Sequence, residues 1–307
     1  MNNNELQIAY YPHNQIDTKK WDTCVVNSEN SRVYANHWYL DRVASNWNAL
    51  VIGDYQYVMP LPVRKKWGIS YVYQPAYCQQ LGIFPEPGIE TAVFLYKQIA
   101  QKFRYCDVQL NAANPPADNS APLSFTPRDN FLLWLGAGYE KIADKYNNNT
   151  TRNIAKALKN NLTISTSIGL AEYLNLKKSN TDPKIIGQNL AVLKNIIAFC
   201  QYKGFGEIHG VYDSRNQLCA AVFFCRWKNR VIYHNAALDN NGKKLGAMFF
   251  LLDQFIRKNA GNDLTLDFEG SMLPGVARFY QGFGALPETY MQLKINSLPW
   301  LLKWIKQ

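Results

Sequence analysis

The stretch Leu266–Lys294 reads LDFEGSMLPGVARFYQGFGALPETYMQLK. Its pattern predicts a strand, a polar loop, a short helix and a second strand. The first strand ends in two acids, Asp267 and Glu269, and the helix closes on Tyr280. Because binding and catalytic side chains often lie on loops at the ends of core strands, this connection is the first candidate for a functional site.

The composition is typical of a globular protein with enough apolar material for two domains. The 307 residues are 47% hydrophobic and 14% aromatic. No apolar run reaches the roughly 18 residues that suggest a membrane span. The first residues, MNNNELQIAYYPHNQ, lack the basic and apolar segments of a signal peptide, so a cytoplasmic protein is expected.

The cysteines and histidines show no spacing of a metal site. The six cysteines include no Cys-x-x-Cys pair, and the four histidines include no pair at i and i+4. Scattered cysteines of this kind are usually buried free thiols. We therefore expect no metal among the cofactors.

The positive charge is concentrated in the second half. Residues 1–150 hold 13 Lys and Arg against 13 Asp and Glu, whereas residues 151–307 hold 20 against 10. Such an excess suits a half that binds a phosphorylated donor, a nucleic acid or an anionic surface. A solvated basic face without a partner is the alternative.

Two segments repeat the same order of elements and predict a duplicated α+β unit. Each has three apolar runs typical of a β-meander, and a helical pattern follows it. The meanders span 49–75 and 206–238, and the helices span 88–103 and 244–259. The polar run that leads into a basic helix at 146–165 marks the change of domain. We thus expect an N-terminal domain over 1–150 and a C-terminal domain over 151–307.

The connection after the second meander has the character of an anion site. The sequence HNAALDNNGKKLG (234–246) predicts a strand, a polar turn and a helix that begins near Leu245. Backbone N–H groups at a helix start are unsatisfied, and the helix dipole favours anions there. The predicted donor-binding residues are Asn241, Gly242, Lys243, Lys244 and Gly246. A plain turn with solvated lysines is the alternative reading.

Taken together, these features resemble the GNAT acyltransferase fold and, more closely, its Fem peptidyltransferase-like branch, in which two GNAT-like domains are fused. The motifs Asp267-Phe268-Glu269-Gly270-Ser271 and Phe279-Tyr280-Gln281-Gly282-Phe283-Gly284 are similar to those of that branch. The basic segment TTRNIAKALKNN (150–161) is similar to its interdomain segment. The resemblance implies two tandem GNAT-like domains, each a mixed, largely antiparallel sheet flanked by helices.

The resemblance also implies an activated donor, either acyl-coenzyme A or aminoacyl-tRNA. In GNAT proteins a Gly-containing turn holds the pyrophosphate of acyl-coenzyme A, and here Met248 stands where that turn has a small residue. Tyr280 fits the tyrosine that protonates a departing thiolate. It also replaces the lysine typical of the enzymes that use aminoacyl-tRNA, and no long helical arm is visible, so tRNA is the less favoured partner.

The candidate catalytic residues are Tyr280, Asp267 and Glu269. Because side chains alternate along a strand, Asp267 and Glu269 are expected on one face, where one of them acts as the base. Ser271 is a candidate hydrogen-bond partner for the acceptor. The alternatives are that Asp267 only caps the loop and that Tyr280 is a core residue.

Further acceptor-binding candidates lie elsewhere in the chain. His234 ends a predicted strand, where it is either a base or a hydrogen-bonded core histidine. Gln79 and Gln80 belong to the amide-rich segment YQPAYCQQLGIF (73–84), which resembles a cleft-lining segment of the branch. The end of the chain, LPWLLKWIKQ (298–307), is a basic amphipathic stretch that either touches a membrane surface or packs on the second domain.

The sequence thus predicts an acyl- or aminoacyltransferase that acts on an amine of a peptide, an amino sugar or a cell-wall precursor. The C-terminal domain is expected to hold the donor, and the cleft between the domains the acceptor. The main alternative is a non-catalytic GNAT-like protein that binds an anionic ligand or a partner. A nucleic-acid binder is a third reading, which rests on the basic half alone.

Overall fold

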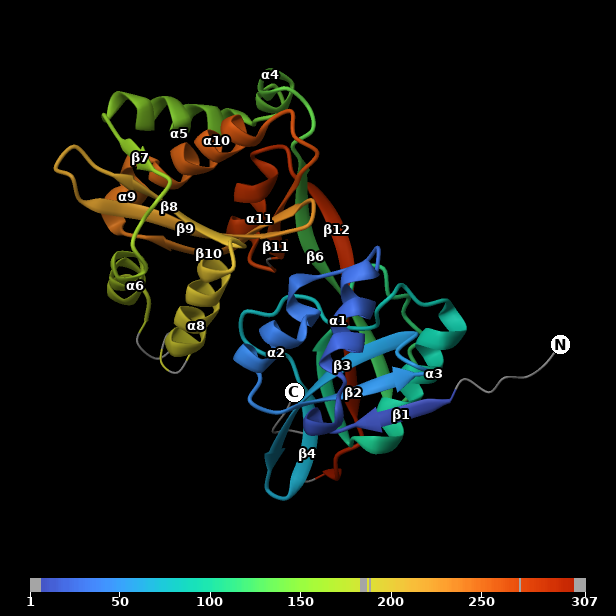
Figure 1. Ribbon diagram of the computed structural model, residues 1–307. Coiled ribbons are helices and arrows are strands. Elements are labelled where there is room, and N and C mark those ends of the chain that lie inside the picture. The colour runs from blue at the N-terminus through green and yellow to red at the C-terminus, as the bar shows by residue number, and fades with distance from the viewer. Residues whose placement is uncertain (1–6, 183–186, 188, 271, 301–307) are drawn as a thin grey trace. The chain divides into compact units, whose positions relative to one another are not determined.

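The computed structural model of the chain describes residues 7–182, 187, 189–270 and 272–300 (Figure 1). Its internal contacts define two compact units. The first contains the residues up to Arg128 and those from Thr289 onward, and the second contains Asp129–Glu288. Residue 150, where the sequence places the boundary between domains, lies within a helix of the second unit.

The first unit is built on a six-stranded sheet with the order β1-β2-β3-β4-β5-β12. All neighbouring strands are antiparallel except β4 and β5, which are parallel. The strands are β1 (Ile8–Tyr11), β2 (Trp47–Ile52), β3 (Tyr57–Lys66), β4 (Ile69–Tyr73), β5 (Tyr105–Gln109) and β12 (Leu286–Asn296).

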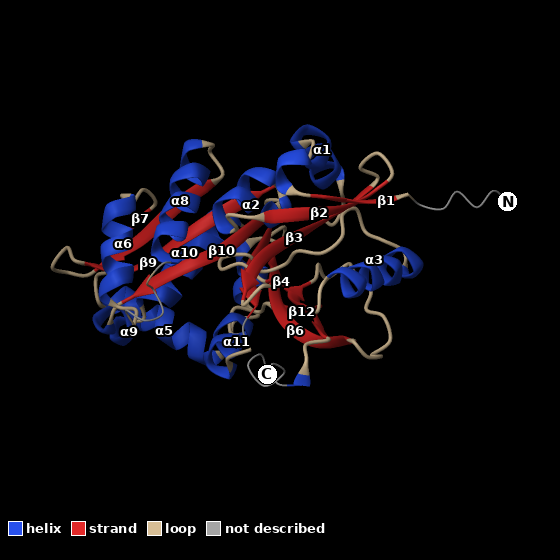
Figure 2. Cartoon of the chain, turned by 90° about the horizontal axis from the view of Figure 1, so that it is seen from below, coloured by secondary structure: helices blue, strands red, loops and turns tan. Residues whose placement is uncertain are grey.

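The helices of the first unit are α1 (Thr18–Asn27), α2 (His37–Val43) and α3 (Ile89–Lys102), with short 3-10 turns at His13–Gln15 and Val33–Ala35. Helix α3 buries Leu95, Tyr96 and Ile99 against the sheet, in one core with Val72 and Leu293 (Figure 2). This apolar face at helical spacing is what the pattern over 88–103 predicts.

The second unit has a sheet with the order β6-β11-β10-β9-β8-β7. Only β10 and β11 are parallel; the other pairs are antiparallel. The strands are β6 (Leu123–Trp134), which begins in the first unit, β7 (Thr163–Ser165), β8 (Gly206–Tyr212), β9 (Leu218–Trp227), β10 (Arg230–Leu238) and β11 (Thr265–Gly270).

Helices cover both faces of this second sheet. Helices α5 and α10 pack together on one face, and α6 and α8 lie on the other (Figure 1). The helices are α4 (Tyr139–Ala143), α5 (Asn148–Lys159), α6 (Leu170–Ser179), α8 (Asn189–Tyr202), α9 (Asn240–Leu245), α10 (Ala247–Asn259) and α11 (Pro274–Gln281). In the core, the rings of Phe224 and Phe255 stack at 3.9 Å.

The two sheets have the same strand order and the same pattern of pairing, with one parallel pair at the same place. The chain leaves the first unit within β6 and returns within β12, so each sheet takes its sixth strand from the other half of the sequence. The predicted α+β class, with mixed, largely antiparallel sheets flanked by helices, is confirmed.

The remaining expectations on single elements have mixed outcomes. Both meanders are present as predicted. Of the six cysteines, five are buried free thiols and Cys24 is partly exposed. Within the described ranges, no helix is long and apolar enough to cross a membrane. Most of the predicted amphipathic end, 301–307, lies outside the described residues, and Trp300 just before it is exposed.

Candidate active site

The candidate site forms where the parallel strands β10 and β11 separate. Their pairing runs from Arg230 opposite Thr265 to Ile232 opposite Asp267. Beyond this point β10 continues to Leu238 and β11 to Gly270 without pairing to each other. Both strands carry a bulge at this place, and a bulge bends its strand. The two bulges therefore open a gap between neighbouring strands.

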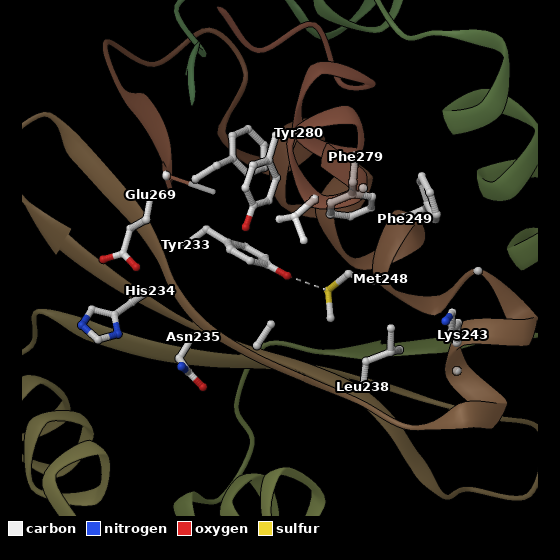
Figure 3. Close-up of a pocket in the computed structure, with 17 residues that line it drawn as sticks. Tyr233, His234, Asn235, Leu238, Lys243, Met248, Phe249, Glu269, Phe279 and Tyr280 are labelled. Atoms are coloured by element: carbon white, nitrogen blue, oxygen red, sulfur yellow. Dashed lines mark hydrogen bonds between the residues drawn. The ribbon is translucent and has the colours of Figure 1, made fainter. Parts of the chain in front are cut away.

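A pocket of about 630 Å³ occupies this gap in the second unit (Figure 3). Its walls come from β10, β11, α9, α11 and the start of α10. The lining residues are Tyr233, His234, Asn235, Ala236, Leu238, Gly242, Lys243, Gly246, Met248, Phe249, Phe268, Glu269, Gly270, Gly275, Val276, Phe279 and Tyr280. The pocket combines an aromatic wall with few polar groups, as expected of a small-molecule site.

Glu269 is turned into the pocket by the bulge in β11. Three residue steps from Asp267 to Gly270 lie opposite two steps of β6. Glu269 has a φ of 54°, which few residues other than glycine adopt. As a result Phe268 and Glu269 both line the pocket. The predicted placement of Asp267 and Glu269 on one face is wrong, because the bulge breaks the alternation.

Asp267 lies in a buried polar network beneath this bulge. It is 1% exposed, and its Oδ2 lies 2.5 Å from Nη1 of Arg230. Its Oδ1 accepts the backbone N–H of Glu269 at 2.9 Å. Nη2 of Arg230 lies 3.9 Å from Glu288, which in turn accepts a hydrogen bond from buried Asn130. The geometry therefore makes Asp267 the support of the bulge that positions Glu269.

Tyr280 lies on the last turn of α11, the helix that begins at Pro274 as the sequence predicts. Its ring stacks on Phe268 at 4.7 Å, and its hydroxyl points into the pocket (Figure 3). Burial, followed by the negative charges of Glu269 and Asp267, raises the pKa of the Tyr280 hydroxyl. The phenol therefore keeps its proton throughout the neutral range and serves as a proton or hydrogen-bond donor.

His234 is the extra residue of the bulge in β10, between Tyr233 and Asn235. It is buried and packs edge-on against Phe223, 5.4 Å between ring centroids. The carboxylate of Glu269 points toward the imidazole ring, and the two lie together at one side of the pocket (Figure 3). The two bulges thus bring two candidate general bases, Glu269 and His234, into the same pocket as the phenol of Tyr280.

Tyr233 is a pocket residue that sequence reasoning missed. Its hydroxyl donates a hydrogen bond to Sδ of Met248 at 3.3 Å, and burial raises its pKa. Its ring meets that of Tyr280 edge-on at 6.0 Å. In a regular strand, the side chains of Tyr233 and His234 would point to opposite faces of the sheet. Only the bulge allows both of them to line the pocket.

The predicted anion turn is a short helix, α9, and not an open loop. Asp239 caps it: its side chain accepts the N–H of Gly242 at 2.6 Å, and its carbonyl accepts the N–H of Lys243. Asp239 thus already binds the backbone N–H groups of Gly242 and Lys243, and the N–H of Gly246 bonds to carbonyls of α9, so these three groups of the predicted anion turn are not free. A Cβ on Gly242 would lie 2.4 Å from the carbonyl oxygen of Cys219, so the close packing requires glycine.

The start of α10 has more of the geometry that an anion site requires. Gly246 precedes it with a φ of 77°, and no side chain of the described residues caps this helix. Gly246, Met248 and Phe249 line the pocket, together with Gly242 and exposed Lys243. The first backbone N–H groups of a helix have no intrahelical acceptor and attract anions with the helix dipole.

Two other predicted donor residues and two acceptor candidates do not line this pocket. Lys244 is exposed, and the Asn241 amide bonds to Asp213 at 2.8 Å. In the first unit, Gln80 is fully buried, and its amide oxygen accepts the N–H of Ala112. Gln79 is partly buried beside it and accepts from the Gln80 amide at 3.4 Å. Ser271 lies outside the described residues.

Helix α6 contacts the free arm of β10, by which we mean residues 233–238, which pair with β9 but not with β11. The Tyr173 hydroxyl bonds to Oδ1 of Asn235, and Nζ of Lys177 bonds to the carbonyl of Ala236, both at 2.7 Å. Burial lowers the pKa of Lys177. Lys177 thus satisfies a backbone carbonyl in the part of β10 that β11 no longer pairs, and Tyr173 fixes the Asn235 side chain beside it.

We expect Lys177→Met to destabilise residues 233–238 of β10 by about 1.5–3 kcal/mol, the usual contribution of a hydrogen bond from a charged donor. The measurement is amide hydrogen exchange over residues 233–238, which should become faster. Lys178→Met, on the exposed neighbour in the same helix, is the matched control. Equal exchange in both variants would show that the Lys177 contact does not hold the arm.

The sequence matches no protein-family model, and no curated protein matches it. Its structure resembles that of FemX, with a TM-score of 0.63 and 13% identity over 98% of this chain and 100% of that one. A conserved protein of unknown function from Bacteroides thetaiotaomicron gives a TM-score of 0.61 and 12% identity, over 94% and 99% of the two chains.

A third similar structure is the C-terminal domain of a protein from Agrobacterium fabrum named as a lysylphosphatidylglycerol synthetase. It gives a TM-score of 0.56 at 8% identity, over 94% of both chains. At such identities the likeness concerns the fold. The expected similarity in fold to a Fem protein is confirmed, over 98% of the chain.

Proposed function

We propose that the chain transfers an acyl or aminoacyl group from an activated donor to an amine. One observation carries the proposal: the separated parallel strands bring Glu269, His234 and Tyr280 to one pocket whose far wall is an uncapped helix start. The similarity to FemX and to the protein named as a lysylphosphatidylglycerol synthetase supports the same class.

The roles follow from the chemistry of the three groups. A carboxylate or imidazole accepts the proton that an amine loses as its nitrogen attacks the acyl carbon. The phenol of Tyr280 donates a proton to the departing thiolate or ribose oxygen as the old carbon–sulfur or carbon–oxygen bond breaks. A new amide bond and a protonated leaving group result, so atoms and charge balance.

The phosphate groups of the donor are the part that we expect this pocket to bind. Lys243 supplies one cation, and the first N–H groups of α10 supply several hydrogen-bond donors. This combination suits the pyrophosphate of acyl-coenzyme A. The edges of the separated strands offer backbone groups to an extended amide chain. Coenzyme A is therefore the first donor to test, as a substrate, and aminoacyl-tRNA is the second.

Replacing Lys243 by alanine should weaken coenzyme A binding about tenfold at low salt, because a hydrogen bond from a charged donor is lost. The measurement is isothermal titration with coenzyme A. Lys244→Ala is the matched control: the same change at the adjacent exposed lysine should alter the dissociation constant less than about twofold. Equal effects would mean that the lysines act only through general charge.

The proposed acyltransferase reaction would be contradicted if no acyl-coenzyme A and no aminoacyl-tRNA stabilised the protein in a thermal-unfolding panel. A donor present at about 100 times its dissociation constant should stabilise the folded chain by about 2.7 kcal/mol. Binding without amine-dependent release of the donor's leaving group would instead favour the non-catalytic reading.

A further inference from the structure

The β3–β4 hairpin of the first unit presents a tryptophan at its tip. Lys66 and Ile69 form its last pair, so Trp67 and Gly68 make a two-residue turn. Both have positive φ, 50° and 77°, as turns of this type require. Asparagine or glycine usually occupies the first position. Here the strained position carries a large apolar ring, and Trp67 is 65% exposed.

A second exposed tryptophan lies at the same end of the same sheet. Val72 of β4 pairs with Cys106 of β5, and the N–H of Ser297 after β12 bonds to the carbonyl of Arg104. Because β4 and β5 are parallel, the turn that precedes β4 and the start of β5 lie at the same end of the sheet, and Trp300 follows Ser297 there by three residues. Two strand spacings separate β4 from β12, roughly 10 Å.

Cations surround these two rings. Lys65 and Lys66 are exposed beside the turn, and Arg104 is exposed between the two strand ends. Nζ of Lys66 lies 4.6 Å from the ring centroid of Trp67. No Asp or Glu occurs in residues 60–75 or from residue 289 to the end of the chain. This end of the sheet is thus cationic and carries exposed aromatic rings.

We propose that Lys65, Lys66, Trp67, Arg104 and Trp300 form a surface that docks on an anionic phospholipid bilayer. Tryptophan prefers the level of the headgroups, where its ring is buried and its N–H stays hydrated. Lysine and arginine beside it are attracted by the anionic lipid surface.

The test is co-sedimentation of the full chain with vesicles of phosphatidylcholine alone or mixed with phosphatidylglycerol. Binding should require phosphatidylglycerol and weaken in high salt. Lys65→Ala with Lys66→Ala should weaken it about 25-fold, given the contribution of each cation near an anionic surface. Trp67→Ala with Trp300→Ala should weaken it at least about tenfold through lost apolar burial.

Two control variants act elsewhere: one makes the same change in charge, and the other removes a single exposed aromatic ring. Lys156→Ala with Lys159→Ala removes two exposed lysines of α5, and Tyr202→Ala removes a side chain that is 81% exposed. Both should bind vesicles like the parent chain. The proposal is overturned if anionic vesicles are not bound, or if the controls weaken binding as much as the variants. Binding of a single-stranded RNA in place of vesicles, lost in the same variants, would overturn it in favour of a nucleic-acid surface.

Discussion

Tyr280→Phe is expected to lower turnover by about 10² to 10⁴-fold, the usual contribution of general acid catalysis. The substitution keeps the ring that stacks on Phe268 and removes only the hydroxyl in the pocket. Among the described residues no hydrogen bond from this hydroxyl is present, so the free energy of unfolding should change little. Turnover is measured with the donor that the thermal-unfolding panel identifies.

Tyr233→Phe is the matched control, because it makes the same change in the same pocket. Its hydroxyl is already bonded to Sδ of Met248. Its turnover should stay within about tenfold of the parent. If Tyr280→Phe retains full activity, or if its loss follows a loss of stability, Tyr280 is a core residue.

The pH dependence provides an independent readout for Tyr280. A general acid must be protonated, so activity falls as pH rises through its pKa. Since burial raises the pKa of Tyr280 above the ordinary phenol value of about 10, turnover should show no basic limb from this group below that pH. A limb near pH 8 that disappears in the Phe variant would contradict the assignment.

Asp267→Ala is expected to destabilise the fold by about 3–5 kcal/mol, the cost of leaving a buried partner charge unpaired. Arg230 is 17% exposed and would lose its carboxylate, and the Glu269 N–H would lose its acceptor. The measurement is equilibrium unfolding in urea. Removing both charges, in Asp267→Ala with Arg230→Met, should recover part of the loss.

The same variant distinguishes a role of Asp267 in positioning Glu269 from a role as the catalytic base. The sequence suggested Asp267 as a base, whereas its buried ion pair and its bond to the Glu269 backbone favour a positioning role. A stable Asp267→Ala protein that has lost turnover would restore the catalytic reading. A variant that loses less than about 1 kcal/mol would show that the network does not hold the bulge.

The sequence was sufficient for the local elements of the candidate site and insufficient for their geometry. The strand, loop and helix around Tyr280 follow from apolar spacing and from Pro274 at the helix start. The orientation of Glu269 does not, because its bulge forms against β6, a strand more than a hundred residues earlier in the chain. A period-2 pattern cannot report a bulge that depends on a distant partner.

The sequence pattern also does not predict that β6 joins the sheet of the second unit and β12 that of the first. Both β6 and β12 are local strands by pattern, but which sheet each one joins depends on contacts far apart in the chain. The N-terminal cap of α9, in contrast, can be predicted from the sequence. Asp239 directly precedes NNGKK, and aspartate is a favoured N-cap residue. Such a cap occupies the first N–H groups of α9 and leaves those of α10 as the more open helix start.

The most direct test of the acyltransferase proposal is hydrogen exchange of the full chain with saturating donor, either acyl-coenzyme A or aminoacyl-tRNA. The account predicts slower exchange at the start of α10, residues 246–250, and along the free arm of β10, residues 233–238, with no comparable change in α8. Protection confined to other elements, or none with either donor, would contradict a donor site between the separated strands.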